Sequence, residues 1–557
     1  MIWARVLRGL VVLGIGGPIL AGLAVTLAAS FGWLPAIGHA DLTLAPWAQA
    51  LAQPGFGTSL RLTLVTGLGA SVLSLALALG VAFRLAMRPG ALRWLAPILA
   101  VPHAALAIGL AFLIAPSGWI ARVLSGPLGW TQPPDLATVG DPLGLALILG
   151  LMLKEVPFLL LVILAALSRV PVAAQMAAGR ALGYRPWAVW LKLVVPQLYP
   201  LIRLPVYVVL AFSLSVVDMA LILGPSHPPT LAVAILRGFS APDPAVALPA
   251  SAMAMLQAGI VAAGIGLWRL AELALAAAGR LWLRRGGRGG AAPVWALAAV
   301  GGGGGLVLAV GSLLVLAIWS LAWRWRFPQP LPESWSLRIW AAPGQGWGGD
   351  AWTTLGLGLA VAGLALVLAI AWLEAEDRLG HRTPLAALIA LPLLMPQIAF
   401  LQGVNVAFLR AGLPPGWGAV LWAHLLFAFP YVLIALAGPW RALDAGLIRS
   451  AASLGAGPVR RLAVVKLPIL LRPILTAAAI GFAVSVAQYL PTLFLGGGRV
   501  VTLTTEAVAL SSASDRRVAA VYAVLQGALP LLAFGAAIIL PALVQRNRAG
   551  LTGALTR

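Results

Sequence analysis

The residues best placed to do chemistry in this chain are the few ionisable ones inside long apolar stretches. Lys154 and Glu155 are adjacent in the apolar run 143–167, and Asp218 lies in the run 201–224. A charged side chain at the centre of a bilayer costs about 2.5–3.5 kcal/mol on insertion scales, so it needs a transport role or a partner. We therefore predict that Lys154, Glu155 and Asp218 line a translocation pathway, with pairing between helices as the alternative.

Polar residues also recur at matching places in the two halves of the sequence. The segment FSLSVVDMALILG parallels FAVSVAQYLPTLFLG, which aligns Asp218 with Gln488. His103 and Gln397 form a second such pair, because each follows a Pro and precedes a Gly at the same distance. Repeat-equivalent positions meet near the interface between two halves, where a pathway would run. We add these residues to the pathway candidates, with interhelical hydrogen bonds as the alternative.

The sequence offers no catalytic or metal-binding constellation. The five His are scattered, and the absence of Cys excludes disulfides and thiolate metal sites. A phosphate-binding Gly-x-x-x-x-Gly-Lys-Ser/Thr loop is also missing. We expect no metal or cofactor on this chain, so energy for any transport must come from another chain or from an ion gradient.

Composition predicts the elements that position these residues. Of 557 residues, 61% are hydrophobic and 9% charged, with a mean hydropathy of +0.99, whereas soluble domains carry roughly 25% charged residues. At roughly 20 residues per span, the chain should be an all-α polytopic membrane protein of about twelve helices. The predicted spans are 6–28, 58–83, 94–115, 143–167, 201–224, 246–273, 294–322, 352–373, 385–409, 417–440, 471–495 and 516–543.

The basic residues predict the topology. The net charge of +22 is concentrated in alternate loops, which the positive-inside rule explains better than a nucleic-acid partner does. Both termini should be cytoplasmic, in a bacterial inner membrane, and the first apolar run should be an uncleaved helix. A Gly- and Arg-rich linker, 279–293, should join two parallel six-helix repeats, 1–278 and 294–557.

Two loops on the predicted cytoplasmic side repeat one another. They are AAGRALGYRPWAVWLKLVVPQ (177–197) and RSAASLGAGPVRRLAVVKLPI (449–469). Each has small residues before a Leu-Gly pair, and a Pro follows the Gly at the same two distances in both. Gly permits a turn that a side chain would block, and Pro suits the first turn of a second helix. The pattern predicts two matched elements that an external protein grips.

At these residues the chain resembles the EAA loops of permeases of binding-protein-dependent ABC importers, which have the type I importer fold. With the duplicated spans, it is similar to the fused permeases of thiamine and iron(III) uptake systems. The Glu of the motif is replaced by Ala177 in one copy and by Arg449 in the other, which leaves the usual Glu contact open, whereas the Gly-centred turn is retained. The ATPase-coupling residues implied by the resemblance are Ala178, Leu182, Gly183, Pro186, Pro196, Ala451, Leu454, Gly455, Pro458 and Pro468.

The resemblance implies a permease that forms the translocation pathway and seats two coupling helices on two copies of a separate ABC ATPase. ATP and Mg²⁺ would bind to those subunits, and a periplasmic binding protein would deliver the substrate. Glu155 and Asp218 favour a cation such as thiamine or a polyamine, while iron(III) remains open. No nucleic acid is expected.

Two other classes compete with this interpretation. A twelve-helix secondary transporter is suggested by the fragment Asp377-Arg378-Leu379-Gly380-His381-Arg382, which resembles a loop signature of major facilitator carriers. Leu373 stands where that signature expects Gly, and the equivalent first-half loop lacks the acidic residue. A membrane-embedded enzyme is disfavoured because no catalytic set is present.

Overall fold

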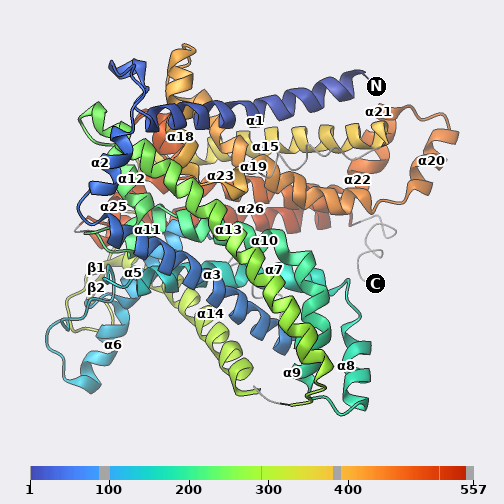
Figure 1. Cartoon of the computed structure of the whole chain (residues 1–557), viewed down its shortest axis with the longest axis horizontal. Helices are drawn as coiled ribbons and strands as arrows, with labels where there is room; N and C mark the ends of the chain where they lie inside the picture. The colour runs from blue at the N-terminus through green and yellow to red at the C-terminus, as the bar shows by residue number, and fades with distance from the viewer. Residues whose placement is uncertain (1, 87–100, 290–291, 381–390, 514, 547–557) are drawn as a thin grey trace.

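The computed structural model describes residues 2–86, 101–289, 292–380, 391–513 and 515–546. Its long helices run from one end of the molecule to the other (Figure 1). Within these residues, ten helices are long and apolar enough to cross a membrane, or eleven if one pair bent by 80° counts as one span. The predicted all-α polytopic fold is confirmed. The predicted span 385–409 and the start of 94–115 lie partly outside the described residues.

The first half of the chain carries the shorter connecting helices at both ends of its spans. Its helices are α1 (Ile2–Ser30), α2 (Ala45–Ala52), α3 (Phe56–Ala86), α5 (His103–Ile114), α6 (Trp119–Leu128), α7 (Leu145–Leu167), α8 (Val172–Ala181), α9 (Pro186–Val189), α10 (Val195–Ser215), α11 (Asp218–Leu223), α12 (Leu231–Phe239) and α13 (Ala247–Arg284).

The second half repeats much of this order and adds a small antiparallel hairpin of strands. Its elements are α14 (Ala292–Leu321), β1 (Ala322–Arg324), β2 (Ser334–Trp335), α15 (Trp347–Leu379), α17 (Leu391–Leu394), α18 (Gln397–Arg410), α19 (Trp417–Arg441), α20 (Ala445–Ser453), α21 (Pro458–Arg461), α22 (Leu467–Ile469), α23 (Leu471–Val486), α24 (Leu490–Gly496), α25 (Leu503–Leu510) and α26 (Arg516–Val544).

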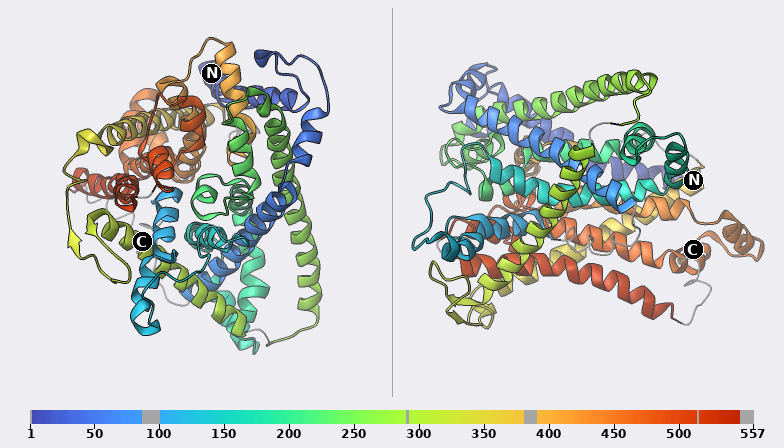
Figure 2. Two further views of the ribbon diagram at one scale, coloured as in Figure 1. Left: turned by 90° about the vertical axis from the view of Figure 1, so that its left-hand side faces the viewer. Right: turned by 90° about the horizontal axis from the view of Figure 1, so that it is seen from below.

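The first helix of each half packs against the other half. Helix α1 lies on α15 and α18, and α14 lies on α3 and α5 (Figures 1 and 2). Glycine permits both crossings: a Cβ on Gly403 would lie 2.0 Å from the carbonyl oxygen of Gly22, and one on Gly109 would lie 2.4 Å from that of Ser312. In both halves the helix backbones therefore approach closely, as small residues allow in membranes.

The fifth predicted span of each half is broken at the same place. Helix α10 ends at Ser215 and α11 starts at Asp218, while α23 ends at Val486 and α24 starts at Leu490. Interrupted helices at membrane depth leave backbone groups without helical partners, so they are tolerated only where protein or water satisfies those groups. The predicted continuous spans 201–224 and 471–495 are wrong in this detail.

Candidate functional site

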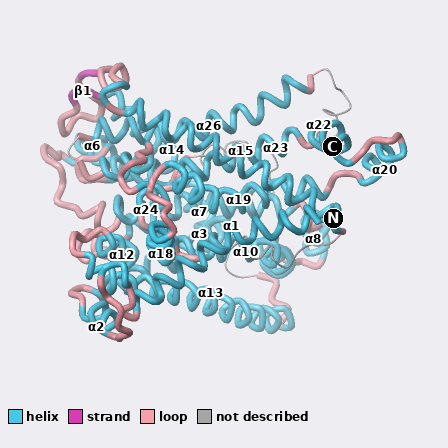
Figure 3. The backbone as a smooth tube through the Cα atoms, turned by 90° about the horizontal axis from the view of Figure 1, so that it is seen from above, coloured by secondary structure: helices cyan, strands magenta, loops and turns pink. Residues whose placement is uncertain are grey.

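The two repeated loops project beyond the spans at one end of the molecule. Helices α8 and α9 of one loop and α20 and α21 of the other lie at the end where α1 begins (Figures 1 and 3). Leu182 is 64% exposed and Leu454 is 87% exposed. Ala178 is exposed and Ala451 is half-buried on the preceding helices. The Leu of each Leu-Gly pair is therefore exposed in both loops.

The turn in the two loops has the same geometry. Gly183 and Gly455 both have φ +79°, a left-handed conformation that a side chain strains. The N–H of Tyr184 donates to the carbonyl of Gly179, and that of Ala456 donates to the carbonyl of Ala451, each at 3.0 Å. This hydrogen bond across a left-handed Gly is the Schellman motif that ends a helix.

The second element of each loop is also repeated. Pro186 is the first residue of α9 and Pro458 the first of α21, as suits a residue without an N–H. Each short helix continues into a π-helical turn, and Pro196 or Pro468 then occupies the second residue of the next helix. The Leu-Gly pairs and both prolines named from the sequence thus occupy matched positions in two similar structures. Ala178 and Ala451 do not match, because Ala451 corresponds to Gly179 in the first loop.

The first loop is held by the segment that follows α13. Lys192 Nζ donates to the carbonyl of Gly287 at 2.6 Å and lies 4.4 Å from the ring centroid of Trp282. The N–H of Arg185 donates to the carbonyl of Arg288 at 3.3 Å. The beginning of the predicted linker therefore lies against the first loop.

The second loop is held instead by carboxylates at the end of α15. Lys466 Nζ donates to Glu374 and to Asp377, each at 2.6 Å, and Arg441 pairs with Glu376 at 2.8 Å. Lys466 and Glu374 are buried, so breaking this network would leave uncompensated charge. Hydropathy gave no signal for these pairings, because the partners lie far apart in the sequence.

This network also explains the fragment that suggested a carrier. Asp377 accepts hydrogen bonds from Lys466 and from the indole N–H of Trp440, and Arg378 pairs with Glu374 one turn earlier on α15. These are structural contacts that anchor a loop. His381 and Arg382, from the same fragment, lie outside the described residues.

A second group of polar residues lies within the bundle. His103 Nε2 is 3.8 Å from Glu155 Oε1, and His103 also lies near Asp218. Lys154 Nζ donates to the carbonyl of Val101. The structure thus brings together His103, Glu155 and Asp218, which come from α5, α7 and α11.

The second half contributes tyrosines to this group. Tyr431 lies near Glu155, and Tyr489 lies near Asp218. Tyr489 lies in the break between α23 and α24 beside Gln488. Within the described residues, the side chains of Gln488 and Gln397 make no hydrogen bond to the two carboxylates. Neither tyrosine was predicted from the sequence. Tyr489 directly follows Gln488, which the repeat had identified.

The helix breaks are stabilised by repeat-equivalent glutamines. In the first half, Gln257 Nε2 donates to the carbonyl of Leu214 at 2.6 Å. In the second half, the hydroxyl of Thr504 donates to the carbonyl of Val486 and accepts from Gln526 Nε2 at 2.7 Å. One backbone carbonyl beside each break thus accepts a hydrogen bond from a side chain of another helix.

Threonines fix the second span of each half against the helix after the break. The hydroxyl of Thr63 accepts from the N–H of Leu231, and that of Thr354 accepts from the N–H of Leu503, each at 2.9 Å. Thr63 and Thr354 are thus equivalent in the fold. The sequence repeat aligned TSLRL, from Thr58, with TTLGL, from Thr353. That alignment differs from the structural one by one helical turn.

Together these features define a multi-pass α-helical membrane protein with a repeated, interrupted fifth span and two matched loops at one end. The chain belongs to the ABC transporter permease family, since it is 33% identical to the inner membrane ABC transporter permease protein YnjC of Escherichia coli (strain K12) over 92% of this chain and 93% of that protein. It is a multi-pass inner membrane protein. The family assignment replaces the secondary-transporter alternative.

Weaker similarities cover parts of the chain. The putrescine transport system permease protein PotI of Escherichia coli (strain K12) is 27% identical over 21% of this chain and 44% of its own length. The spermidine/putrescine permease protein PotC of Haemophilus influenzae is 22% identical over 22% of this chain and 47% of its own length. No protein-family model matches the chain.

Proposed function

We propose that this permease is driven by two separate ATPase subunits, one seated on loop 177–197 and the other on loop 449–469. The observation that carries the proposal is the repetition of one exposed turn, with φ +79° at Gly183 and Gly455, at the same end of the molecule. Closure of an ATPase dimer would move both loops, and the ion network around Lys466 would pass that motion to α15 and α19. A periplasmic binding protein would deliver the solute at the opposite end.

Purification with the ATPase tests the coupling. The wild-type chain is expected to carry two ATPase copies, measured by native mass spectrometry. Replacing the exposed leucines, Leu182→Asp and Leu454→Asp, should each remove one copy. Leu413→Asp, at another exposed leucine (52% exposed), is the matched control and should leave the stoichiometry unchanged. Retention of both copies by the double variant would contradict the proposal.

We further propose that the solute is a cation. Beside the basic side chains of His103 and Lys154, the polar group within the bundle contains two carboxylates, Glu155 and Asp218, and two aromatic rings, Tyr431 and Tyr489. Carboxylates and aromatic rings both attract positive charge. The partial similarity to polyamine permeases supports an organic amine; a thiamine-like cation or iron(III) also fits two carboxylates.

Uptake by the complete transporter in proteoliposomes tests the charge preference. Glu155→Gln and Asp218→Asn should each reduce uptake of the cationic solute about tenfold, because a charge-assisted contact contributes about 1.5–3 kcal/mol. Asp135→Asn, at an exposed carboxylate, is the control and should transport normally. Undiminished uptake by both pathway variants, or transport of an anion in place of amines, would refute the proposal.

A further inference from the structure

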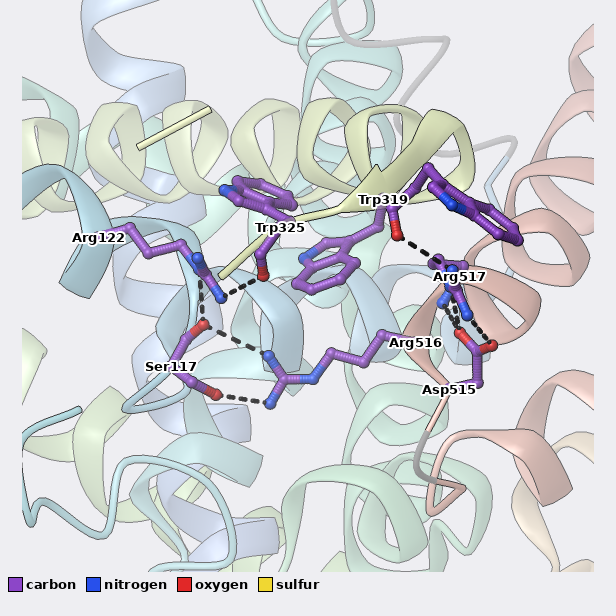
Figure 4. Close-up of a pocket in the computed structure, with 8 residues that line it drawn as sticks. Ser117, Arg122, Trp319, Trp325, Asp515, Arg516 and Arg517 are labelled. Carbon is purple, nitrogen blue, oxygen red and sulfur yellow. Dashed lines mark hydrogen bonds and ion pairs between the residues drawn. The ribbon is translucent and has the colours of Figure 1, made fainter. Parts of the chain in front are cut away.

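A pocket of about 580 Å³ lies between the two halves of the chain, at the end opposite the repeated loops. Ser117 and Arg122 come from the first half, and Trp319, Trp325 and Arg516 from the second (Figure 4). The volume lies within the range of small-ligand sites, about 300–1,000 Å³. The site is distinct from the pathway residues and from both loops.

Two cations in this pocket converge on one neutral oxygen. Arg122 Nε donates to the carbonyl of Ser117 at 3.0 Å, and Arg516 donates to the same carbonyl at 3.4 Å and to the Ser117 hydroxyl at 2.9 Å (Figure 4). Like charges that share an acceptor repel one another, and a neutral carbonyl offsets this only in part.

The described residues supply no carboxylate to either guanidinium. The remaining hydrogen-bond partners of Arg122, which is 4% exposed, are the carbonyls of Trp325, Arg326 and Gln329. Its guanidinium also lies over the rings of Trp319, Trp325 and Phe327. The nearby carboxylate of Asp515 is engaged by Arg517 at 2.7 Å. Arg122 and Arg516 therefore leave two positive charges in the pocket without a counter-ion from this part of the chain.

The donors of Arg516 are only partly used. A guanidinium has five N–H groups, and in the described part of the chain Arg516 hydrogen-bonds only to Ser117. Its charge lies 5.6 Å from the ring centroid of Trp319 and 5.5 Å from that of Phe112. Trp319 is 9% exposed, and its buried indole N–H has no hydrogen-bond partner among the described residues. An unpaired buried donor beside two cations points to a missing acceptor.

We infer that this pocket binds an anionic phosphate group, held by Arg516 with Arg122 and Trp319 beside it. Guanidinium donors match the oxygens of a phosphate in a paired geometry. Tryptophan is typical of the level of lipid headgroups, so the phosphate belongs either to an anionic phospholipid or to a free phosphate ion. The bound anion joins α5 and α6 of the first half to α14 and α26 of the second.

Thermal unfolding of the full-length chain in detergent tests this site. The probes are a short-chain phosphatidylglycerol, a short-chain phosphatidylcholine and inorganic phosphate. We expect the wild-type midpoint to rise with phosphatidylglycerol more than with phosphatidylcholine. Arg516→Gln should raise the half-saturating concentration of phosphatidylglycerol about tenfold or more. Arg516→Lys, which keeps the positive charge, should raise this concentration less. Arg237→Gln, an exposed arginine outside the pocket, is the matched control.

Stabilisation by phosphatidylglycerol alone identifies a lipid headgroup, and equal stabilisation by inorganic phosphate identifies a free ion; both support the phosphate site. A wild-type midpoint that responds to neither anion would overturn it, as would an unchanged response in Arg516→Gln. If Arg516→Gln does not fold, Trp319→Phe removes only the indole N–H and should still weaken the response several-fold. An unaltered response in that variant would then count against the site.

Discussion

Gly183 and Gly455 show how a single residue type sets the shape of both loops. A Cβ on Gly455 would meet nothing within 4 Å, and one on Gly183 would meet only the side chain of Arg288, at 3.8 Å. Steric crowding is therefore not the reason for glycine here. The positive φ alone requires it, because an L-residue in the left-handed region costs about 1–2 kcal/mol.

Substitution at these glycines should uncouple the transporter without preventing insertion. Gly183→Val and Gly455→Val are expected to lower solute uptake per ATP hydrolysed, because the loops no longer close the turn that presents Leu182 and Leu454. Uptake and phosphate release, measured together in proteoliposomes, give this ratio. Gly457→Ala is the matched control, since Gly457 has φ −66° and open space around it. Normal coupling in both valine variants would show that the turn is not needed.

The glycines that permit the helix crossings act at the scale of elements. Gly109 and Gly403 follow the Pro-His and Pro-Gln pairs that the sequence repeat identified, and each faces the first helix of the opposite half. The same repeat position thus performs the same packing task twice. In lipid such contacts depend on close packing, because the lipid tails are as apolar as the side chains.

A methyl group at either crossing should push two helices apart. Gly403→Ala is expected to lower the free energy of unfolding by about 1–3 kcal/mol, the usual cost of overpacking, because the obstructing atom is the backbone oxygen of Gly22. Gly363→Ala, within α15 and with nothing within 4 Å, should be neutral or slightly stabilising. Thermal unfolding in detergent compares the two. Equal midpoints would mean that α1 and α18 do not approach this closely in the solubilised protein.

At this scale the sequence predicted what depends on local composition. The spans could be located because about twenty apolar residues in a row are typical of a transmembrane helix. The loops could be located because Leu-Gly and Pro recur at fixed distances. The breaks at Asp218 and Gln488 were hidden, since apolar residues continue through them and the satisfying partners, Gln257 and Thr504, come from other helices. The Lys466 network was equally hidden, because its ion pairs join residues far apart in the chain.

The molecule as a whole is held together by contacts between its halves as well as by the linker. Helices α1 and α14 each pack on the opposite half. The largest buried apolar cluster contains residues of both halves, including Ile19, Leu147, Leu316 and Phe400. We propose on this basis that the covalent connection near 279–293 is not needed to keep the halves associated.

Cleavage of the linker tests that proposal. A protease site inserted directly after Gly289 should give two fragments that co-elute in detergent. We expect this because α1 and α14 stay packed on the opposite halves after the cut. Size-exclusion chromatography with mass analysis measures the association, and the uncut protein is the reference. Separate elution of the two fragments would show that the linker itself maintains the assembly.

The packing of α1 on helices of the second half has a consequence for biosynthesis. Translation delivers α1 first, yet the helices on which it packs, α15 and α18, are encoded more than half a chain later. During that interval α1 can pack on α13, its neighbour in the first half, but not on α15 and α18. The bundle can therefore close only when the second half has entered the membrane, so a ribosome that stops at the linker leaves a product unable to complete its own packing.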